Sequence, residues 1–152
     1  MKKIHWFILV LAAVFVVLQL IPNRIPEKTE AGPEDLFAVH QVPEPVAGIL
    51  KTSCYDCHSR QTHYPWYSKI APVSWLLSRD IREGRKELNF SEWGTLGKRQ
   101  QIGKLESIRD EVTGGSMPLP VYTLVHRNAK LSPEQVAALS AWTDDLTAKI
   151  LE

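Results

Sequence analysis

Cys54-Tyr55-Asp56-Cys57-His58 is a C-x-x-C-H stretch, and the rest of the sequence is best understood from it. Two cysteines separated by two residues, with a histidine directly after the second, suit the covalent attachment of a haem. Each thiol can form a thioether with one vinyl group, while the histidine becomes an iron ligand. The stretch therefore predicts haem attachment at Cys54 and Cys57, with His58 on the iron.

Three other uses of the two cysteines remain open: a Cys-x-x-Cys redox pair, half of a zinc site, or two buried thiols. A zinc site normally has four protein ligands. The sequence has no third cysteine, so two distant histidines would have to complete such a site. A thioredoxin-like redox pair is expected within a βαβ unit, whereas the residues around Cys54 do not have the pattern of strands. The haem interpretation fits the stretch better than any of these.

The composition narrows the class of protein further. The 152 residues hold 18 Lys and Arg against 17 Asp and Glu. No clustered basic surface of the kind that neutralises phosphates is visible, so nucleic acid is not an expected partner. Both cysteines lie in the motif, and a second C-x-x-C-H is absent. The sequence therefore predicts one covalent haem c per chain and needs no disulfide.

The N-terminal segment predicts a membrane anchor. Lys2 and Lys3 precede an apolar run over residues 4–21, IHWFILVLAAVFVVLQLI. As a helix this run would be about 27 Å long, close to the hydrocarbon thickness of a bilayer. A cleaved signal peptide is the alternative, but small residues at the spacing of a cleavage site do not follow the run. We expect residues 1–21 to be a single-pass anchor in the inner membrane, with the rest of the chain in the periplasm.

The remaining sequence divides into a tether and a haem domain. Residues 22–45 are rich in proline and charge, so this segment is expected to be a semi-extended tether. Within it, the short apolar stretch Leu36–Val39 is a candidate for docking on the domain. Residues 46–152 are expected to form the c-type haem-binding domain.

Apolar spacing within residues 46–152 predicts an all-α fold, a cytochrome c-like helical domain of about four helices. The first runs from Pro45 into the cysteines, and Gly48 on it either permits a close helix crossing or is simply tolerated. The second covers residues 71–88, the third 96–112, and the fourth begins at Ser132 with capping-box chemistry and runs to about Leu151. The expected inward positions are Val46, Ile49 and Leu50; Val73, Leu76, Leu77, Ile81 and Leu88; Ile102, Leu105, Ile108 and Val112; and Val136, Leu139, Trp142, Leu146 and Ile150. The basic residues Arg79, Arg82, Arg85 and Lys86 are expected on the solvated face of the second helix, with pairing to haem propionates as an alternative.

Met117 is the predicted sixth ligand. It is the only methionine after the first residue and lies between Gly-Gly-Ser and Pro-Leu-Pro, about 60 residues beyond the motif. A thioether in such a loop can reach the opposite haem face and complete His/Met coordination. The structural alternative is a methionine that fills a gap in the core. His126 is the runner-up ligand, followed by His63 and His40.

Several segments together resemble a known family, the small bacterial haem-binding domains with a single C-x-x-C-H. The likeness covers about residues 46–146. It rests on residues 54–58, on 64–75 (YPWYSKIAPVSW), on 88–93 (LNFSEW), on Met117-Pro118 and on the pattern from His126 to Trp142. The resemblance implies attachment at Cys54 and Cys57 and axial ligation by His58, and it strengthens His126 as a rival to Met117. It implies no substrate.

The sequence thus predicts a membrane-anchored, periplasmic c-type cytochrome that transfers single electrons. Its expected partners are redox proteins of the membrane or the periplasm, and it is expected to be an electron carrier rather than an enzyme. The alternative is a haem-based sensor or gas-binding module, or a peroxidase-like enzyme, in which the sixth iron position is open. In a peroxidase-like site, His63 or His126 could act as the acid or base.

Overall fold

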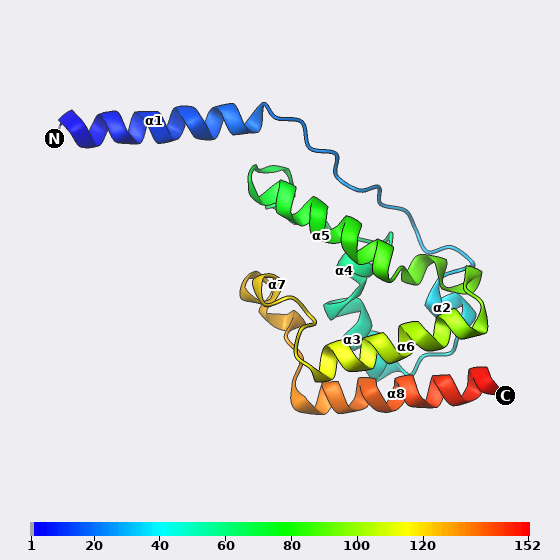
Figure 1. Cartoon of the computed structure of the whole chain (residues 1–152). Coiled ribbons are helices and arrows are strands. Elements are labelled where there is room, and N and C mark those ends of the chain that lie inside the picture. The colour runs from blue at the N-terminus through cyan, green and yellow to red at the C-terminus, as the bar shows by residue number, and fades with distance from the viewer. Residues whose placement is uncertain (1) are drawn as a thin grey trace.

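The computed structural model describes residues 2–152, and within them the chain forms helices and no strand (Figure 1). The prediction of an all-α chain with an N-terminal apolar helix is therefore confirmed. The α-helices are α1 (Lys2–Gln19), α2 (Leu36–Val39), α3 (Glu44–Ser53), α4 (Tyr55–His58), α5 (Val73–Glu87), α6 (Lys98–Thr113), α7 (Pro120–Val125) and α8 (Pro133–Leu151). Short 3₁₀ helices are η1 (Trp66–Lys69), η2 (Phe90–Thr95) and η3 (Arg127–Ala129). Outside α1, the four helices of ten residues or more are α3, α5, α6 and α8.

Helices α6 and α8 lie side by side and antiparallel, and α3 packs against α8 (Figure 1). Their apolar residues recur at helical spacing, which gives each helix one buried face. The start of α8 is fixed by Ser132, whose hydroxyl accepts a hydrogen bond from the backbone N–H of Gln135. The predicted inward positions are confirmed for these three helices, with Leu50, Leu105 and Leu139 fully buried. This packing supports one wall of the site described below.

A column of aromatic rings joins α2 and α4 to η2. Phe37 stacks on Tyr55 at 4.8 Å between ring centroids, and Tyr55 stacks on Phe90 at 4.9 Å. The Tyr55 hydroxyl donates to the buried carboxylate of Asp35. Because that carboxylate also accepts from Gln61 Nε2 at 2.7 Å, its burial is compensated by hydrogen bonds. The segment Leu36–Val39 thus docks on the domain, with Leu36 fully buried.

Helix α5 buries only part of the face that its apolar residues predict: Ile81 is fully buried as expected, and Leu77 and Leu88 are half-buried. Its buried side chains are Ser74, Ser78 and Ile81, whereas Val73 is 46 % and Leu76 39 % exposed. The prediction that Val73 and Leu76 face inward is wrong. Small serine side chains allow the extended segment after α1 to lie close to the helix, and this segment covers the serine face.

The segment predicted as a tether lies along the domain in extended form (Figure 1). Asn23 Nδ2 donates to the Ser74 carbonyl at 2.8 Å and to Ser78 Oγ at 2.9 Å. Farther along, the Tyr64 hydroxyl donates to the Pro26 carbonyl, and the backbone N–H of Thr29 donates to the Arg60 carbonyl at 2.8 Å. Proline-rich sequence keeps this segment extended, and hydrogen bonds to its backbone hold it on the domain.

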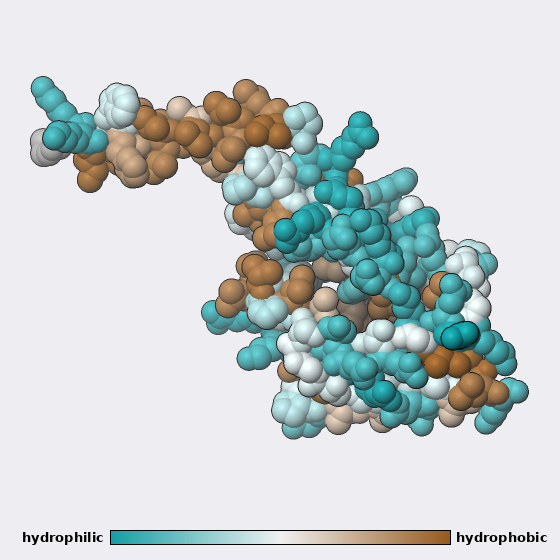
Figure 2. All heavy atoms as spheres, viewed as in Figure 1, coloured by the Kyte–Doolittle hydropathy of each residue, from teal (hydrophilic) through white to brown (hydrophobic). Residues whose placement is uncertain are grey.

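Helix α1 is long and apolar enough to cross a membrane, and none of its residues is buried against the rest of the protein. A membrane span and a signal sequence both meet this description. In Figure 2 it stands out as a continuous apolar rod that projects from the polar surface of the domain.

Candidate functional site

The junction of α3 and α4 places the two cysteines and the histidine on one short turn. Cys54 ends α3 and begins α4, with φ −126° and ψ −43°. Its carbonyl accepts hydrogen bonds from the backbone N–H groups of Cys57, at 3.2 Å, and His58, at 2.9 Å. Residues three and four apart share one face of a helical turn. The turn therefore presents Cys54, Cys57 and His58 in the same direction.

His58 is held in the form that a metal ligand needs. Its Nδ1 lies 2.9 Å from the Gly84 carbonyl and 3.2 Å from the Leu88 carbonyl. Since carbonyl oxygens only accept, Nδ1 must carry the hydrogen, which leaves the lone pair of Nε2 available. Burial lowers the pKa of His58 despite these two hydrogen bonds, so the ring is neutral at pH 7. A neutral imidazole with Nδ1–H tied to a carbonyl is a typical iron or zinc ligand.

Gly84 allows α5 to approach this turn closely. A Cβ atom at position 84 would lie 3.0 Å from the Cys57 carbonyl oxygen and 3.4 Å from His58 Cε1. The first distance would require the backbone to shift. The close helix crossing is therefore at Gly84, whereas Gly48 has no atom near its missing side chain and is merely tolerated.

The cysteines are half-buried, unpaired thiols. Burial raises the pKa of the Cys54 thiol to about 12. Burial, together with the nearby carboxylates of Asp56 and Asp80, raises the pKa of Cys57 to about 11. A catalytic redox pair requires a lowered thiol pKa, so this setting disfavours the redox interpretation. Within residues 2–152, no cluster of three or more His, Cys, Asp or Glu could hold a metal ion, which disfavours a zinc site.

These residues line a pocket of about 400 Å³ between α4, α5, α6 and α7. In Figure 2 the pocket is visible as a hollow between α5 and α6. Its size lies in the range of small-molecule and cofactor sites. One side carries Cys54, Cys57 and His58, and the walls are mostly apolar, from Leu88, Phe90, Ile108, Val112, Pro118 and Leu119. Charged side chains at the pocket include Asp80, Glu83, Glu87, Lys104 and Glu111.

Met117 lines the same pocket from the loop between α6 and α7. The backbone N–H groups of Ser116 and Met117 both donate to the Glu111 carbonyl near the end of α6, at 3.1 and 3.2 Å. Gly115, with a φ of 72°, provides the left-handed turn that this path needs. The loop thus brings a thioether to the pocket that contains His58.

The rival histidines lie elsewhere. His126 Nε2 is 2.5 Å from the Tyr67 hydroxyl, and its ring stacks on Tyr122 at 4.3 Å between centroids. His126 is not among the residues that line the pocket. His63 is exposed on the loop after α4, where its backbone N–H donates to the Asp56 carboxylate.

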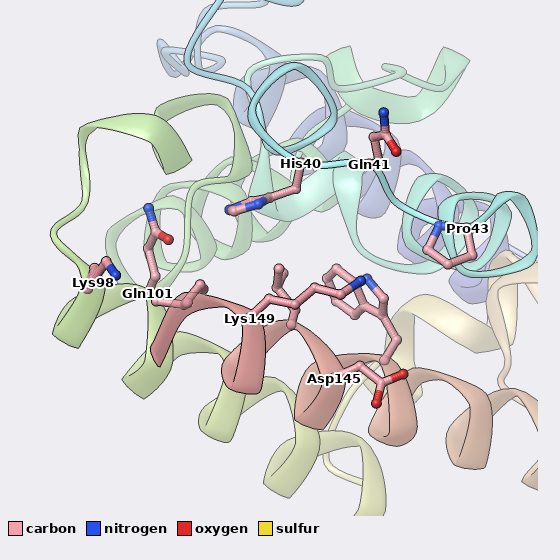
Figure 3. A pocket seen from close by; sticks show the side chains of 10 residues that line it. His40, Gln41, Pro43, Lys98, Gln101, Asp145 and Lys149 are labelled. Carbon is pink, nitrogen blue, oxygen red and sulfur yellow. The ribbon is translucent and has the colours of Figure 1, made fainter. Parts of the chain in front are cut away.

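His40 lies in a second pocket, of about 480 Å³, beside the C-terminal half of α8. Figure 3 shows the His40 ring pointing toward Gln101 of α6, with Lys149 of α8 on another side of the pocket. The residues that line this pocket include no cysteine and no methionine. Burial lowers the pKa of His40. His40 is therefore separated from the cysteine motif.

Two arginines of α5 bind backbone carbonyls instead of facing the pocket. Arg82 donates to the Arg24 carbonyl at 2.8 Å. Arg85 donates to the carbonyls of Ser59, at 2.8 Å, and Glu27, at 2.9 Å. Both arginines hold the extended segment against α5, and neither is among the residues that line the pocket.

Sequence reasoning missed the residues that position the site. The carbonyls of Gly84 and Leu88 orient His58, and Tyr122 donates to Asp56 Oδ2 at 2.8 Å, which ties α7 to the cysteine turn. Every residue has a backbone carbonyl, so the sequence cannot indicate which carbonyls bind His58. Gly84 in the middle of an amphipathic helix was the one available signal.

The donor set fits a haem. One apolar pocket presents two thiols, a neutral imidazole with a free Nε2 and a thioether. Soft sulfur and imidazole ligands are those that hold haem iron and attach the porphyrin. The residues present can therefore hold the group that the motif predicts.

Comparison with known proteins agrees with this geometry. The family model described as haem-binding domain matches residues 13–145, a region that starts within α1 and includes the extended segment on α5. No curated protein and no solved structure matches the chain. Since the family model covers most of the sequence, the chain belongs to the haem-binding domain family.

Proposed function

We propose that the chain is a membrane-anchored c-type cytochrome that carries one covalent haem in the periplasm and transfers single electrons. The observation that carries this proposal is the convergence of Cys54, Cys57, His58 and Met117 on one apolar pocket. These four side chains come from two segments about 60 residues apart, and together they can provide two covalent bonds and two axial ligands. The proposed redox partners are proteins of the membrane or the periplasm.

Cys54 and Cys57 are the proposed attachment residues. Each S–H bond adds across a vinyl C=C bond, so that sulfur bonds to one carbon and hydrogen to the other. This addition needs no oxidant and leaves no leaving group. The two thiols available for it are half-buried and unpaired, and burial raises the pKa of both.

His58 and Met117 are the proposed axial ligands. His58 would bind through Nε2, held by the hydrogen bonds of Nδ1 to the Gly84 and Leu88 carbonyls. When bound, the haem supplies an iron that gains or loses one electron. The chain keeps the ligands in place and excludes water with apolar walls such as Phe90 and Ile108. Because the chain keeps both ligands in place, the site would rearrange little when the iron gains or loses an electron. Such a site favours fast electron transfer over chemistry at the iron.

Absorption spectra test electron transfer against a sensor or a peroxidase. With both axial positions occupied, we expect sharp low-spin bands in the reduced protein and no change after addition of CO, because no coordination site is free. The reference is the same protein unfolded in denaturant with CO added, since unfolding releases the methionine and opens the site. Ready CO binding by the folded protein would contradict the electron carrier and favour a sensor or a peroxidase-like enzyme.

The anchor is the second part of the proposal. Its support is the apolar length of α1 and the two lysines at its start, which favour a cytoplasmic N-terminus. Mass spectrometry of the protein from the membrane fraction should find residues 1–21 present. The protein should also remain in the membranes after a wash with alkaline carbonate. A mature N-terminus near residue 22 would instead make the chain an exported protein without an anchor.

A further inference from the structure

Six large apolar side chains, each at least 39 % exposed, lie on elements at the side of the domain nearest the end of α1. We name them the α1-proximal patch, which consists of Trp66 of η1, Val73 and Leu76 of α5, and Val121, Leu124 and Val125 of α7. Trp66 is 82 % and Leu124 76 % exposed. Exposed apolar groups that gather in this way mark a surface that contacts another apolar phase or partner.

A hydrogen bond and packing contacts join the three elements of the patch. The Tyr67 hydroxyl lies 2.5 Å from His126 Nε2 and so connects η1 to the end of α7. Trp66 stands edge-on to Tyr67 at 5.8 Å between centroids. Elements η1 and α5 are also in contact. The patch is therefore one surface of fixed shape.

The patch is fixed relative to α1 as well. Gln19, the last residue of α1, donates from Nε2 to the Ala71 carbonyl at 3.1 Å and accepts from the Ala71 N–H at 3.0 Å. Four residues later, Asn23 binds Ser74 and Ser78 of α5. These contacts join the end of α1 to the beginning of α5, directly beside the patch.

The hydrogen bonds between Gln19 and Ala71 set the depth of the patch in a membrane. An 18-residue helix is about 27 Å long, so an α1 that spans the hydrocarbon places Gln19 at its surface. Figure 1 shows α7 and the segment that leads into α5 on the side of the domain toward α1, with the C-terminus on the far side. Tryptophan and tyrosine favour the membrane interface. The exposed basic residues Lys69 and Arg127 flank the patch and suit anionic headgroups.

We infer that the α1-proximal patch rests on the lipid surface around α1, with Trp66, Leu124 and Val125 in the boundary between headgroups and acyl chains. This inference rests on the anchor in the proposed function. It adds a fixed orientation of the domain on the bilayer. Helix α7 presents Val121, Leu124 and Val125 outward, while Leu119 and Tyr122 line the haem pocket. The haem pocket is thus held about one helix diameter, roughly 10 Å, from the membrane surface, which suits electron exchange with a partner inside the membrane.

The test measures how fast a bulky, water-soluble maleimide reacts with a cysteine introduced into the patch. The full-length protein is placed in lipid nanodiscs that hold one chain each, and Leu124→Cys is compared with Leu151→Cys. Leu151 is 70 % exposed and lies at the C-terminal end of α8, so it is a matched position away from α1. Each rate is divided by the rate for the same variant unfolded in denaturant. We expect a several-fold lower relative rate at position 124 than at 151.

Each outcome of this experiment has one meaning. Equal relative rates at 124 and 151 in nanodiscs would overturn the docking and leave the anchor intact. The same rates are also measured in lipid vesicles crowded with the protein. If position 124 were protected only there, a second copy of the chain would cover the patch, and the inference would also be overturned. Failure of the full chain to enter nanodiscs would disprove the anchor, and the docking with it. Labelling of the unsubstituted chain, which is subtracted, reports only on whether Cys54 and Cys57 are blocked by haem.

Discussion

Alanine at both Cys54 and Cys57 should abolish the haem band completely on a denaturing gel stained for haem peroxidase activity. Covalently bound haem stays with an unfolded chain, whereas haem held only by axial ligands leaves when the pocket is lost. The unsubstituted protein should show the band, because both thiols line the pocket beside His58. The measurement compares stain intensity with total protein in the same lane.

Single substitutions provide the controls for this experiment. Cys54→Ala and Cys57→Ala each leave one thiol, so each variant should keep a band with an absorption spectrum shifted by the remaining unreacted vinyl group. Met117→Leu should keep the full band, since an axial ligand is not needed for a thioether. Extraction of the haem from the unsubstituted protein by acid-acetone would disprove covalent attachment while leaving haem binding intact.

The sequence was most informative where local rules decide the structure. Helices α6 and α8 carry apolar residues at helical spacing over four turns, and Ser132, Pro133 and Gln135 mark the start of α8. In such segments the buried face follows from the sequence because one stripe is apolar and the rest is polar. The core positions Leu105, Leu139 and Trp142 were therefore predictable.

Helix α5 shows where this reasoning fails. Its apolar spacing predicts that Val73 and Leu76 face the core, but Ser74 and Ser78 are buried instead because an extended segment with polar contacts lies over them. The partner of that face is Asn23, about 50 residues away, and its hydrogen bonds leave no periodic signal. The displaced residues Val73 and Leu76 then form part of the α1-proximal patch.

Helix α7 was missed for a related reason. Pro120 belongs to the stretch that the sequence predicts as a loop, yet proline is well suited to the first turn of a helix. Six residues are too few for periodicity to be recognised. That Cys54, Cys57, His58 and Met117 share one pocket, in contrast, could be expected from the sequence, because their residue types are specific. The carbonyl groups that orient His58 could not.

Met117→Leu should open the sixth coordination position. Leucine has nearly the volume of methionine and packs similarly, so this variant removes the thioether without leaving a cavity. The folded protein should then bind CO stoichiometrically after reduction, whereas the unsubstituted protein should bind none. The weak far-red charge-transfer absorption expected of ferric haem with a thioether ligand should disappear. The reduction potential should fall, because a thioether stabilises the ferrous state.

His126→Phe is the matched control for this change. Phenylalanine can keep the stacking on Tyr122 but has no nitrogen for iron or for the Tyr67 hydroxyl. We expect this variant to keep the far-red absorption and to remain closed to CO, since His126 does not line the pocket. If His126→Phe opened the iron to CO while Met117→Leu changed nothing, the loop at Met117 would only pack beside the haem. The bond between His126 and Tyr67 would then have to break when haem binds, so that α7 could turn its histidine into the pocket.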